Sequence, residues 1–175
     1  MERRSGPTLA RSLDPRGLSG YAALFGAEAR LGVVTETVAP GAFGRALAGG
    51  RDIVALVDHD PTRLLARQRS GTLRLREDTQ GLAFDLDLPD TQAGRDILAL
   101  AARGDLGGMS FGFTIPEGGE RWDGNHRTLL QVDLVEISVV SAWPAYDSTV
   151  VKPRARRRNH YRRRLAQITL DSLEL

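Results

Sequence analysis

Cysteine is absent from the 175 residues, and lysine occurs only once among the 24 basic side chains. Without cysteine the chain can form no disulfide, no thiolate nucleophile and no cysteine-ligated zinc site. The longest uninterrupted apolar run is 97–102, which is far shorter than a membrane-spanning helix. No apolar stretch follows the charged residues 1–4, so we expect a soluble protein without a targeting peptide or a membrane partner.

Positive charge is concentrated near the end of the chain. Residues 152–164 hold eight basic side chains and no acid, whereas residues 1–151 hold 16 basic and 20 acidic side chains. We therefore expect a mildly acidic domain followed by a basic tail at 152–175. Such a tail can bind nucleic acid or an acidic protein surface, and it can equally be a solvated, disordered segment. Aromatic residues make up only 6%, so nucleic acid is expected as a partner only through the tail.

Residues 1–18 mix Arg, Pro, Ser and Gly, which is typical of a flexible arm. After this arm, short apolar runs alternate with turn residues, as in a domain rich in strands. Single strands are predicted at 21–25, 33–38, 53–57, 109–115, 128–134 and 136–142. Period-2 alternation at 72–76 and 82–88, around a glycine-containing turn, predicts an antiparallel hairpin with one solvated face.

Two helices are predicted. A short one covers 42–48, and a longer one begins after Asp90 or Thr91 and ends at Gly104. Residues 116–126 are polar and predict a loop that carries a tryptophan. The order of these elements favours an α+β domain with mainly antiparallel strands and no internal repeat.

His59 is the histidine that a scaffold could hold as a catalytic base. It follows a predicted apolar strand and is flanked by Asp58 and Asp60, whereas His126 lies in the polar loop and His160 in the tail. An imidazole is the most common general base near neutral pH. A metal site is not predicted, because the further His ligands that it would recruit are missing. The alternative is a turn histidine that its acidic neighbours stabilise.

Ser110 is the candidate nucleophile. The neighbouring Gly108 and Gly112 would let a substrate backbone approach closely. The segment 108–112 fits the Gly-x-Ser-x-Gly pattern of α/β-hydrolases, but strand-forming residues follow it instead of a helix, which excludes that fold. The alternative is a serine in a strand without a chemical role.

Glu136 and Asp133 are the acids that could orient His59. Both lie in an apolar stretch, where a buried carboxylate is costly unless it is paired. In an uninterrupted strand the two side chains point to opposite faces, so only one of them could reach the imidazole. The alternative is a carboxylate on an edge strand in water. A nucleophile, a base and an acid suffice for a serine hydrolase, although the chain order His, Ser, acid matches none of the familiar serine proteases.

Five ordered segments of the sequence are shared with a known family. They are Asp58-His59-Asp60-Pro61, Ser70-Gly71-Thr72-Leu73-Arg74-Leu75, Leu88-Pro89-Asp90-Thr91, Gly104-Asp105-Leu106 with Met109-Ser110-Phe111-Gly112-Phe113, and Leu134-Val135-Glu136-Ile137-Ser138-Val139-Val140 with Pro144-Ala145-Tyr146. Gly20-Tyr21 and Pro40-Gly41-Ala42-Phe43 fit the opening segment of the same family. Together these segments resemble the prohead (capsid maturation) serine proteases of tailed phages. The resemblance covers roughly 19–151, which we take as the protease domain.

This resemblance implies a fold and a set of roles. The family is distantly similar to the herpesvirus assembly proteases, which have a β-barrel core wrapped by helices. By position, His59 is implied to be the base, Ser110 the nucleophile and Glu136 the third member, where herpesvirus enzymes use a second His. We assign the oxyanion hole that acyl transfer requires to the backbone amides of Ala145 and Tyr146, which follow the strand of Glu136. No cofactor or metal is expected.

The resemblance also implies a function. Such proteases are packed inside the immature shell, where they cleave the scaffolding segment of the major capsid protein and usually themselves. We therefore expect a serine endopeptidase in the bacterial host cytoplasm, inside the assembling procapsid, with the capsid protein as its partner and dimerisation as in the herpesvirus enzymes. The tail at 152–175 is expected to dock onto acidic scaffold. The alternative is a non-catalytic assembly or scaffold protein with a protease-like fold.

Overall fold

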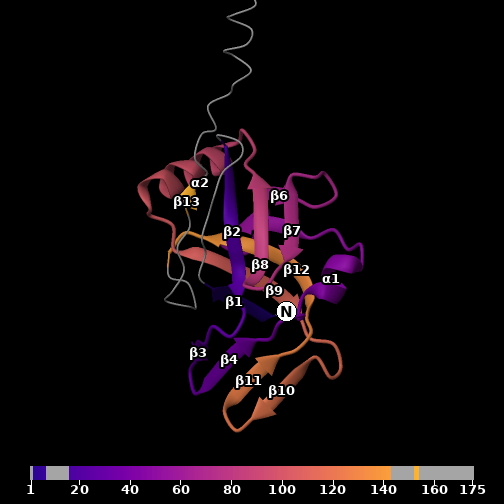
Figure 1. Cartoon of the computed structure of the whole chain (residues 1–175). Helices are drawn as coiled ribbons and strands as arrows, with labels where there is room; N and C mark the ends of the chain where they lie inside the picture. Colours follow the sequence, from indigo (N-terminus) through magenta and orange to yellow (C-terminus); the bar gives the residue numbers. More distant parts are fainter. Residues whose placement is uncertain (1, 7–15, 143–151, 154–175) are drawn as a thin grey trace, which may run out of the picture.

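A computed structural model describes residues 2–6, 16–142 and 152–153 of the chain. Most of these residues lie in strands that form three separate sheets, and two helices lie at the periphery (Figure 1). The predominance of strands with mainly antiparallel pairing is confirmed, and the two helices are compatible with the expected α+β class. The expected closed barrel is not found in the described part of the chain, because the strands are divided among sheets of five, four and four strands that each end in open edges.

The sheet that carries the candidate residues has the strand order β1-β9-β12-β5-β6. Its strands are β1 (Glu2–Gly6), β5 (Val54–Val57), β6 (Asp60–Arg67), β9 (Gly108–Thr114) and β12 (Asp133–Val140). The central strand β12 pairs antiparallel with β9 and parallel with β5. Three segments that are far apart in sequence therefore lie side by side, each with one of the candidate residues in it or directly after it.

Two four-stranded sheets complete the fold. One has the order β10-β11-β4-β3 and lies at the bottom of Figure 1, and the other has the order β13-β2-β8-β7. The strands of the first are β3 (Ala29–Leu31), β4 (Val34–Val38), β10 (Glu120–Asp123) and β11 (His126–Leu129). Those of the second are β2 (Gly17–Leu24), β7 (Leu73–Glu77), β8 (Gly81–Asp87) and β13 (Lys152–Pro153).

One face of the five-stranded sheet points into the hydrophobic core. Its buried residues are Ala55, Val57, Met109, Phe111, Phe113, Ile137 and Val139. Phe111 meets Phe43 edge to face, with ring centroids 5.5 Å apart, and stacks on Phe113 at 5.2 Å. Burying each such ring contributes about 1.5–3 kcal/mol. Because side chains alternate along β9, Ser110 and Gly112 lie on the opposite face.

The longer helix, α2 (Gln92–Arg103), forms as the sequence predicts. The Thr91 side chain accepts a hydrogen bond from a backbone N–H in the first turn, and Gly104 ends the helix with a φ of 78°. Ile97 and Ala101 are buried against the core. The short helix, α1 (Gly44–Ala48), is likewise confirmed. No helix in the described part of the chain is long and apolar enough to cross a membrane.

Three local predictions are wrong. The expected arm at 1–18 contains β1, which pairs along the edge of β9, while 7–15 lies outside the described residues. The expected loop at 116–126 contains β10. This strand lies at the exposed edge of its sheet, where polar side chains face water. The predicted strands 128–134 and 136–142 are divided elsewhere: residues 130–132 separate β11 from β12, and β12 runs through residue 135. Of the expected basic tail, β13 pairs with β2 and the remainder lies outside the described residues.

A buried ion pair joins two strands of the lower sheet. Nη1 of Arg127 on β11 lies 3.1 Å from Oε2 of Glu36 on β4, and the Glu36 side chain is 0% exposed. Nε of Arg127 also lies 2.6 Å from Oε2 of Glu120, and the guanidinium lies 5.5 Å from the ring centroid of Trp122. A charge as deeply buried as Glu36 persists only when it is paired.

Arg127→Met should lower the free energy of unfolding by about 3–5 kcal/mol, because it leaves a buried carboxylate without this cation. The matched control is Arg95→Met, which removes an exposed pair with Asp90 and should cost at most about 1 kcal/mol. Urea unfolding of both variants checks this difference. Equal losses would show that the buried pair contributes no more than a surface pair.

Candidate active site

His59 stands in a two-residue turn between β5 and β6, whose last paired residues are Val57 and Asp60. Both turn residues have a positive φ, 50° at Asp58 and 61° at His59. Positive φ at both positions is what a type I′ hairpin turn requires, and outside glycine it costs roughly 1–2 kcal/mol per residue. Such strain persists where the surroundings determine the backbone conformation, which is common at functional sites.

Residues of β12 and the residue after it hold this turn in place. The backbone N–H of Asp58 donates to the carbonyl oxygen of Val139 at 2.9 Å. The Asp58 carboxylate accepts hydrogen bonds from the backbone N–H of Ser141 at 2.8 Å and from its hydroxyl at 2.9 Å. The backbone N–H of His59 donates to Oγ of Ser138 at 3.1 Å. Both turn residues are therefore anchored to the central part of the sheet.

The imidazole of His59 contacts the carboxylate of Glu136 on β12. Nδ1 of His59 lies 2.7 Å from Oε1 of Glu136, and the two side chains are 15% and 2% exposed. A carboxylate can only accept, so this contact favours the tautomer with the proton on Nδ1, which leaves the lone pair on Nε2. An imidazole held in this tautomer and orientation meets the requirement for a general base.

Ser138 belongs to the same network, although the sequence did not single it out. Its hydroxyl donates to Oε2 of Glu136 at 2.6 Å and accepts from the backbone N–H of His59. Both carboxylate oxygens of Glu136 are therefore bound, which fixes the plane of the carboxylate. The signal that could have found Ser138 is its position two residues after Glu136, on the same face of an apolar strand.

A β-bulge decides which face Glu136 occupies. Leu134 pairs with Phe113 of β9, but Glu136 pairs with Gly112, so the extra residue Val135 shifts the register by one. Without the bulge, Glu136 would lie opposite Phe111 on the core face, because a one-residue slip reverses every side chain. The bulge thus brings the carboxylate to the face of the sheet that carries Ser110.

The bulge also changes the expectation for Asp133. An uninterrupted strand would place Asp133 and Glu136 on opposite faces. With the bulge, Asp133 pairs with Thr114 and lies on the same face as Glu136. Asp133 nevertheless lies about 10 Å farther along the strand, at about 3.3 Å per residue. Glu136 is therefore the acid that reaches His59.

Gly112 leaves room for the carboxylate. Glu136 packs directly over the backbone of this glycine on the neighbouring strand, and a Cβ at position 112 would collide with Oε1. Gly112 therefore has a steric role, and its φ is not in the positive range that favours glycine. The bulge and the glycine together define the place of Glu136.

Ser110 lies on β9, one strand away from the His59–Glu136 pair. It pairs with Ser138 on β12, and residues directly opposite in an antiparallel pair have Cβ atoms about 4.5–5.5 Å apart on the same face. Ser110 is only 1% exposed. The three sequence-predicted residues thus lie on adjacent strands or at a strand end, with His59 and Glu136 in direct contact and Ser110 beside Ser138.

The acids that flank His59 are occupied elsewhere. Hydrogen bonds from the hydroxyl and the backbone N–H of Thr62 lower the pKa of Asp60, which keeps this carboxylate ionised near neutral pH. The Asp58 carboxylate binds Ser141 and lies 3.3 Å from Nη1 of Arg63. Within the described residues, neither flanking carboxylate contacts the imidazole, so the Glu136 contact is what orients the ring.

The remaining candidates lie outside this cluster. Nε2 of His126 lies 3.1 Å from the hydroxyl of Thr37 on the lower sheet. Ala145, Tyr146 and His160 fall outside the described residues. Among the residues that are described, no group of three His, Asp or Glu side chains gathers as a metal site.

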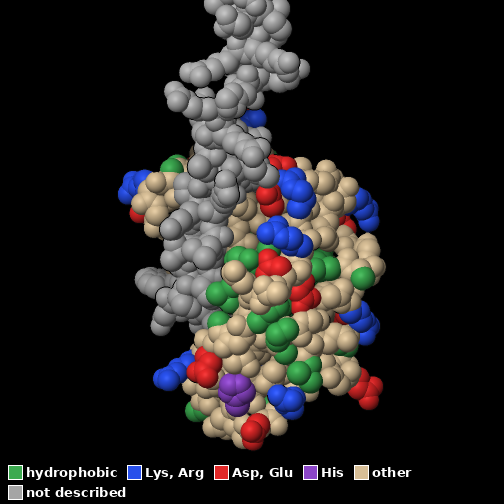
Figure 2. Space-filling view, viewed as in Figure 1, with side chains coloured by type: hydrophobic (Ala, Val, Ile, Leu, Met, Phe, Trp, Pro, Cys, Tyr) green, Lys and Arg blue, Asp and Glu red, His purple; other side chains and the backbone are tan. Residues whose placement is uncertain are grey.

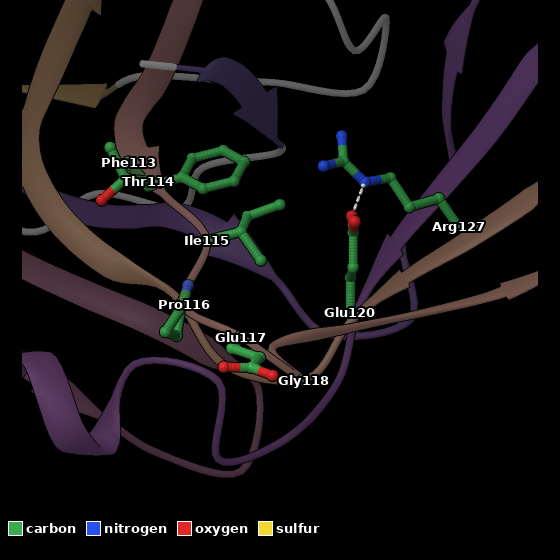
Figure 3. Close-up of a pocket in the computed structure, with 8 residues that line it drawn as sticks. All are labelled: Phe113, Thr114, Ile115, Pro116, Glu117, Gly118, Glu120 and Arg127. Carbon is green, nitrogen blue, oxygen red and sulfur yellow. Dashed lines mark hydrogen bonds and ion pairs between the residues drawn. The ribbon is translucent and has the colours of Figure 1, made fainter.

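A hollow of about 470 Å³ opens at the end of β9 (Figure 3). The chain from Phe113 to Gly118 forms one wall, and the paired side chains of Glu120 and Arg127 form the other. Figure 3 shows the ring of Phe113 and the side chain of Ile115 facing the Glu120–Arg127 pair. The hollow includes none of the three catalytic candidates, but it begins three residues after Ser110.

Gly112→Ala should separate Glu136 from His59, because the new methyl group would occupy the place of Oε1. In ¹⁵N NMR spectra, His59 should change from a single Nδ1–H tautomer to a mixture. The control is Gly44→Ala, whose methyl group would meet its nearest atom at an ordinary 3.5 Å. A single Nδ1–H tautomer in both variants would show that the contact does not depend on this space.

Comparison with known proteins identifies the family. A model of the caudovirus prohead serine protease family matches residues 8–164, which includes all of the residues of the site described above. Searches of curated proteins and of solved structures found no match. Because the matched stretch covers most of the chain, this protein belongs to the caudovirus prohead serine protease family.

Proposed function

We propose that this chain is an active serine endopeptidase in which Ser110 is the nucleophile, His59 the general base and Glu136 the acid that orients the base. The observation that carries this proposal is the 2.7 Å contact between Nδ1 of His59 and Oε1 of Glu136. The register that pairs Ser110 with Ser138, a residue bound to both His59 and Glu136, supports it further. Membership in a family of serine proteases agrees with the same assignment.

The reaction is acyl transfer from a peptide bond to Ser110 and then to water. Nε2 of His59 takes the hydroxyl proton while Oγ of Ser110 bonds to the carbonyl carbon, and the imidazolium then gives this proton to the departing amine. Water attacks the acyl-enzyme with His59 again as the base, and the proton returns to Ser110. The chain emerges unchanged, and the products are a carboxylic acid and an amine.

Glu136 contributes to this cycle through position and charge. It fixes the tautomer that leaves Nε2 as the acceptor, and its negative charge stabilises the imidazolium that forms during attack. Its burial strengthens this attraction, because little water screens the pair. The oxyanion in turn needs donors, and we assign that role to the backbone N–H groups of Ala145 and Tyr146, directly after β12.

The family membership also bears on the biological role. A prohead protease acts in capsid maturation, inside the procapsid in the host cell and in contact with the capsid protein. Our finer proposal is that this chain removes the scaffolding segment of the major capsid protein and cleaves itself. In this proposal 19–151 is the protease domain, which resembles the herpesvirus assembly proteases and forms dimers as they do, and 1–18 and 152–175 flank it.

The charge distribution supports a protein substrate. On the face shown in Figure 2, acidic and basic side chains of the described residues are interspersed, and no large area of one sign is visible. Residues 1–151 carry 16 basic and 20 acidic side chains, so nucleic acid binding would need the basic residues of 152–175. We propose instead that this segment docks the enzyme onto acidic scaffold, an attraction that salt would screen.

A non-catalytic assembly protein with a protease-like fold is the second candidate. The observation that favours it is the 1% exposure of Ser110, because a nucleophile must meet its substrate. Against it stands the number of features that serve only the placement of Glu136 and His59: the bulge, Gly112 and the strained turn. A structural protein has no need to keep all three.

Ser110→Ala should abolish cleavage of the capsid protein while the fold survives. His59→Ala should lower kcat as severely, by about 10⁵–10⁶-fold, and Glu136→Gln should lower it less, by about 10⁴-fold, because the orienting acid contributes least. The test is co-expression with the major capsid protein from the same locus, followed by intact mass analysis. His126→Ala and Ser70→Ala are matched controls on other parts of the surface.

The parent chain and both controls should shorten the capsid protein at its N-terminus, and Ser110→Ala should leave it intact. This result would establish the protease activity and the cleavage site. Assembled shells with uncut capsid protein in every case would contradict the proposal. That outcome would favour the non-catalytic assembly role.

A further inference from the structure

The edge of the nucleophile strand is occupied by the start of the chain. β1 pairs antiparallel with β9 over five residues, and its Ser5 lies opposite Ser110 (Figure 1). On the other side of β9 lies β12, which carries Glu136. Within the described part of the chain, β1 is the outermost strand on this side of the sheet.

This position matters because a protease holds its substrate extended beside the nucleophile. Strand addition to a sheet edge supplies the main-chain hydrogen bonds for such a grip. Neighbouring strands lie about 4.8 Å apart, so a peptide in the place of β1 would lie next to Ser110, whereas a peptide added outside β1 would lie about twice as far away. The place nearest to Ser110 in the plane of the sheet is thus the one that β1 fills.

The composition of β1 suits a segment that can leave. Its sequence, Glu-Arg-Arg-Ser-Gly, contains no β-branched, aromatic or aliphatic residue. Glu and Gly are depleted in strands, and the segment offers little apolar surface to bury. The pairing therefore relies on main-chain hydrogen bonds to the edge of β9, which any extended peptide can replace.

We infer that the edge of β9 is the binding site for the extended substrate peptide, and that β1 occupies this site in the resting protein as an internal competitor. This inference rests on the proposed function, because it assigns the substrate-binding part of the same site. The 1% exposure of Ser110 is then the property of a closed state, and substrate enters when β1 leaves.

The hollow of Figure 3 lies at the end of this edge. Phe113, the first of its lining residues, is also the β9 residue that pairs with Glu2 of β1. A peptide bound in the register of β1 and longer at its N-terminal side would continue toward the hollow. Apolar side chains such as Ile115 and the Glu120–Arg127 pair would meet that part of the substrate.

The test compares two double variants of β1. Arg3→Pro with Arg4→Pro removes two successive backbone N–H groups. In an antiparallel pair, only every second residue forms hydrogen bonds with a given neighbouring strand. One of the two substitutions therefore removes an N–H that donates to β9. Arg3→Ala with Arg4→Ala removes the same charges and keeps both N–H groups. The substrate is a synthetic peptide that spans the cleavage site found by co-expression.

The proline variant should show the higher kcat/KM. If β1 covers the edge for about nine-tenths of the time, its release raises kcat/KM about tenfold, whereas the alanine variant stays near the parent value. A synthetic peptide with the sequence of residues 1–7 should inhibit the proline variant competitively and the alanine variant much less. Its binding to the proline variant that also carries Ser110→Ala should shift the amide NMR signals of β9.

Equal kcat/KM and equal peptide binding in the two variants would overturn the inference and leave the protease function intact. Lower activity of the proline variant would also overturn it, because β1 would then be a supporting strand. Absence of cleavage in all variants, combined with peptide binding at β9 only in the proline variant, would refute the protease function and retain the edge as a strand-binding site.

Discussion

The hydrogen bond between Nδ1 of His59 and Oε1 of Glu136 is the contact on which the rest of the site depends. It determines the tautomer of the base, and it provides the partner that a carboxylate buried to 2% exposure requires. Three local features serve this one bond: a strained turn that presents the imidazole, a bulge that turns Glu136 to the correct face, and Gly112 as the space beside it. The core on the other face of the sheet supplies the stability that these features cost.

Local signals in the sequence were sufficient for several elements. Thr91 and Gly104 bound α2 as expected, because a side-chain acceptor and a left-handed glycine act within one helical turn. The hairpin of β7 and β8 followed from period-2 alternation around a glycine turn. The sequence also placed His59 correctly after a strand, because the residues of β5 form an uninterrupted apolar run.

Features that depend on pairing could not be predicted in the same way. The bulge at Val135 exists only relative to β9, so the single strand carried no sign of it. Ser138 gained its role from His59, a residue far away in sequence. The polar strands β1 and β10 have the composition of loops, and they become strands only by pairing with β9 and β11. The arrangement of the strands in three open sheets likewise depends on contacts across the whole domain.

In the proposed enzyme, His59 and Glu136 activate Ser110. The most direct measurement treats the purified protein with a fluorophosphonate, which bonds to an activated serine with loss of fluoride, and locates the adduct by peptide mass spectrometry. We expect one adduct, at Ser110, that is absent in His59→Ala and forms more slowly in Glu136→Gln. Activation of Ser110 would be refuted if the folded parent protein formed no adduct there, or if the His59→Ala variant formed the adduct as fast as the parent.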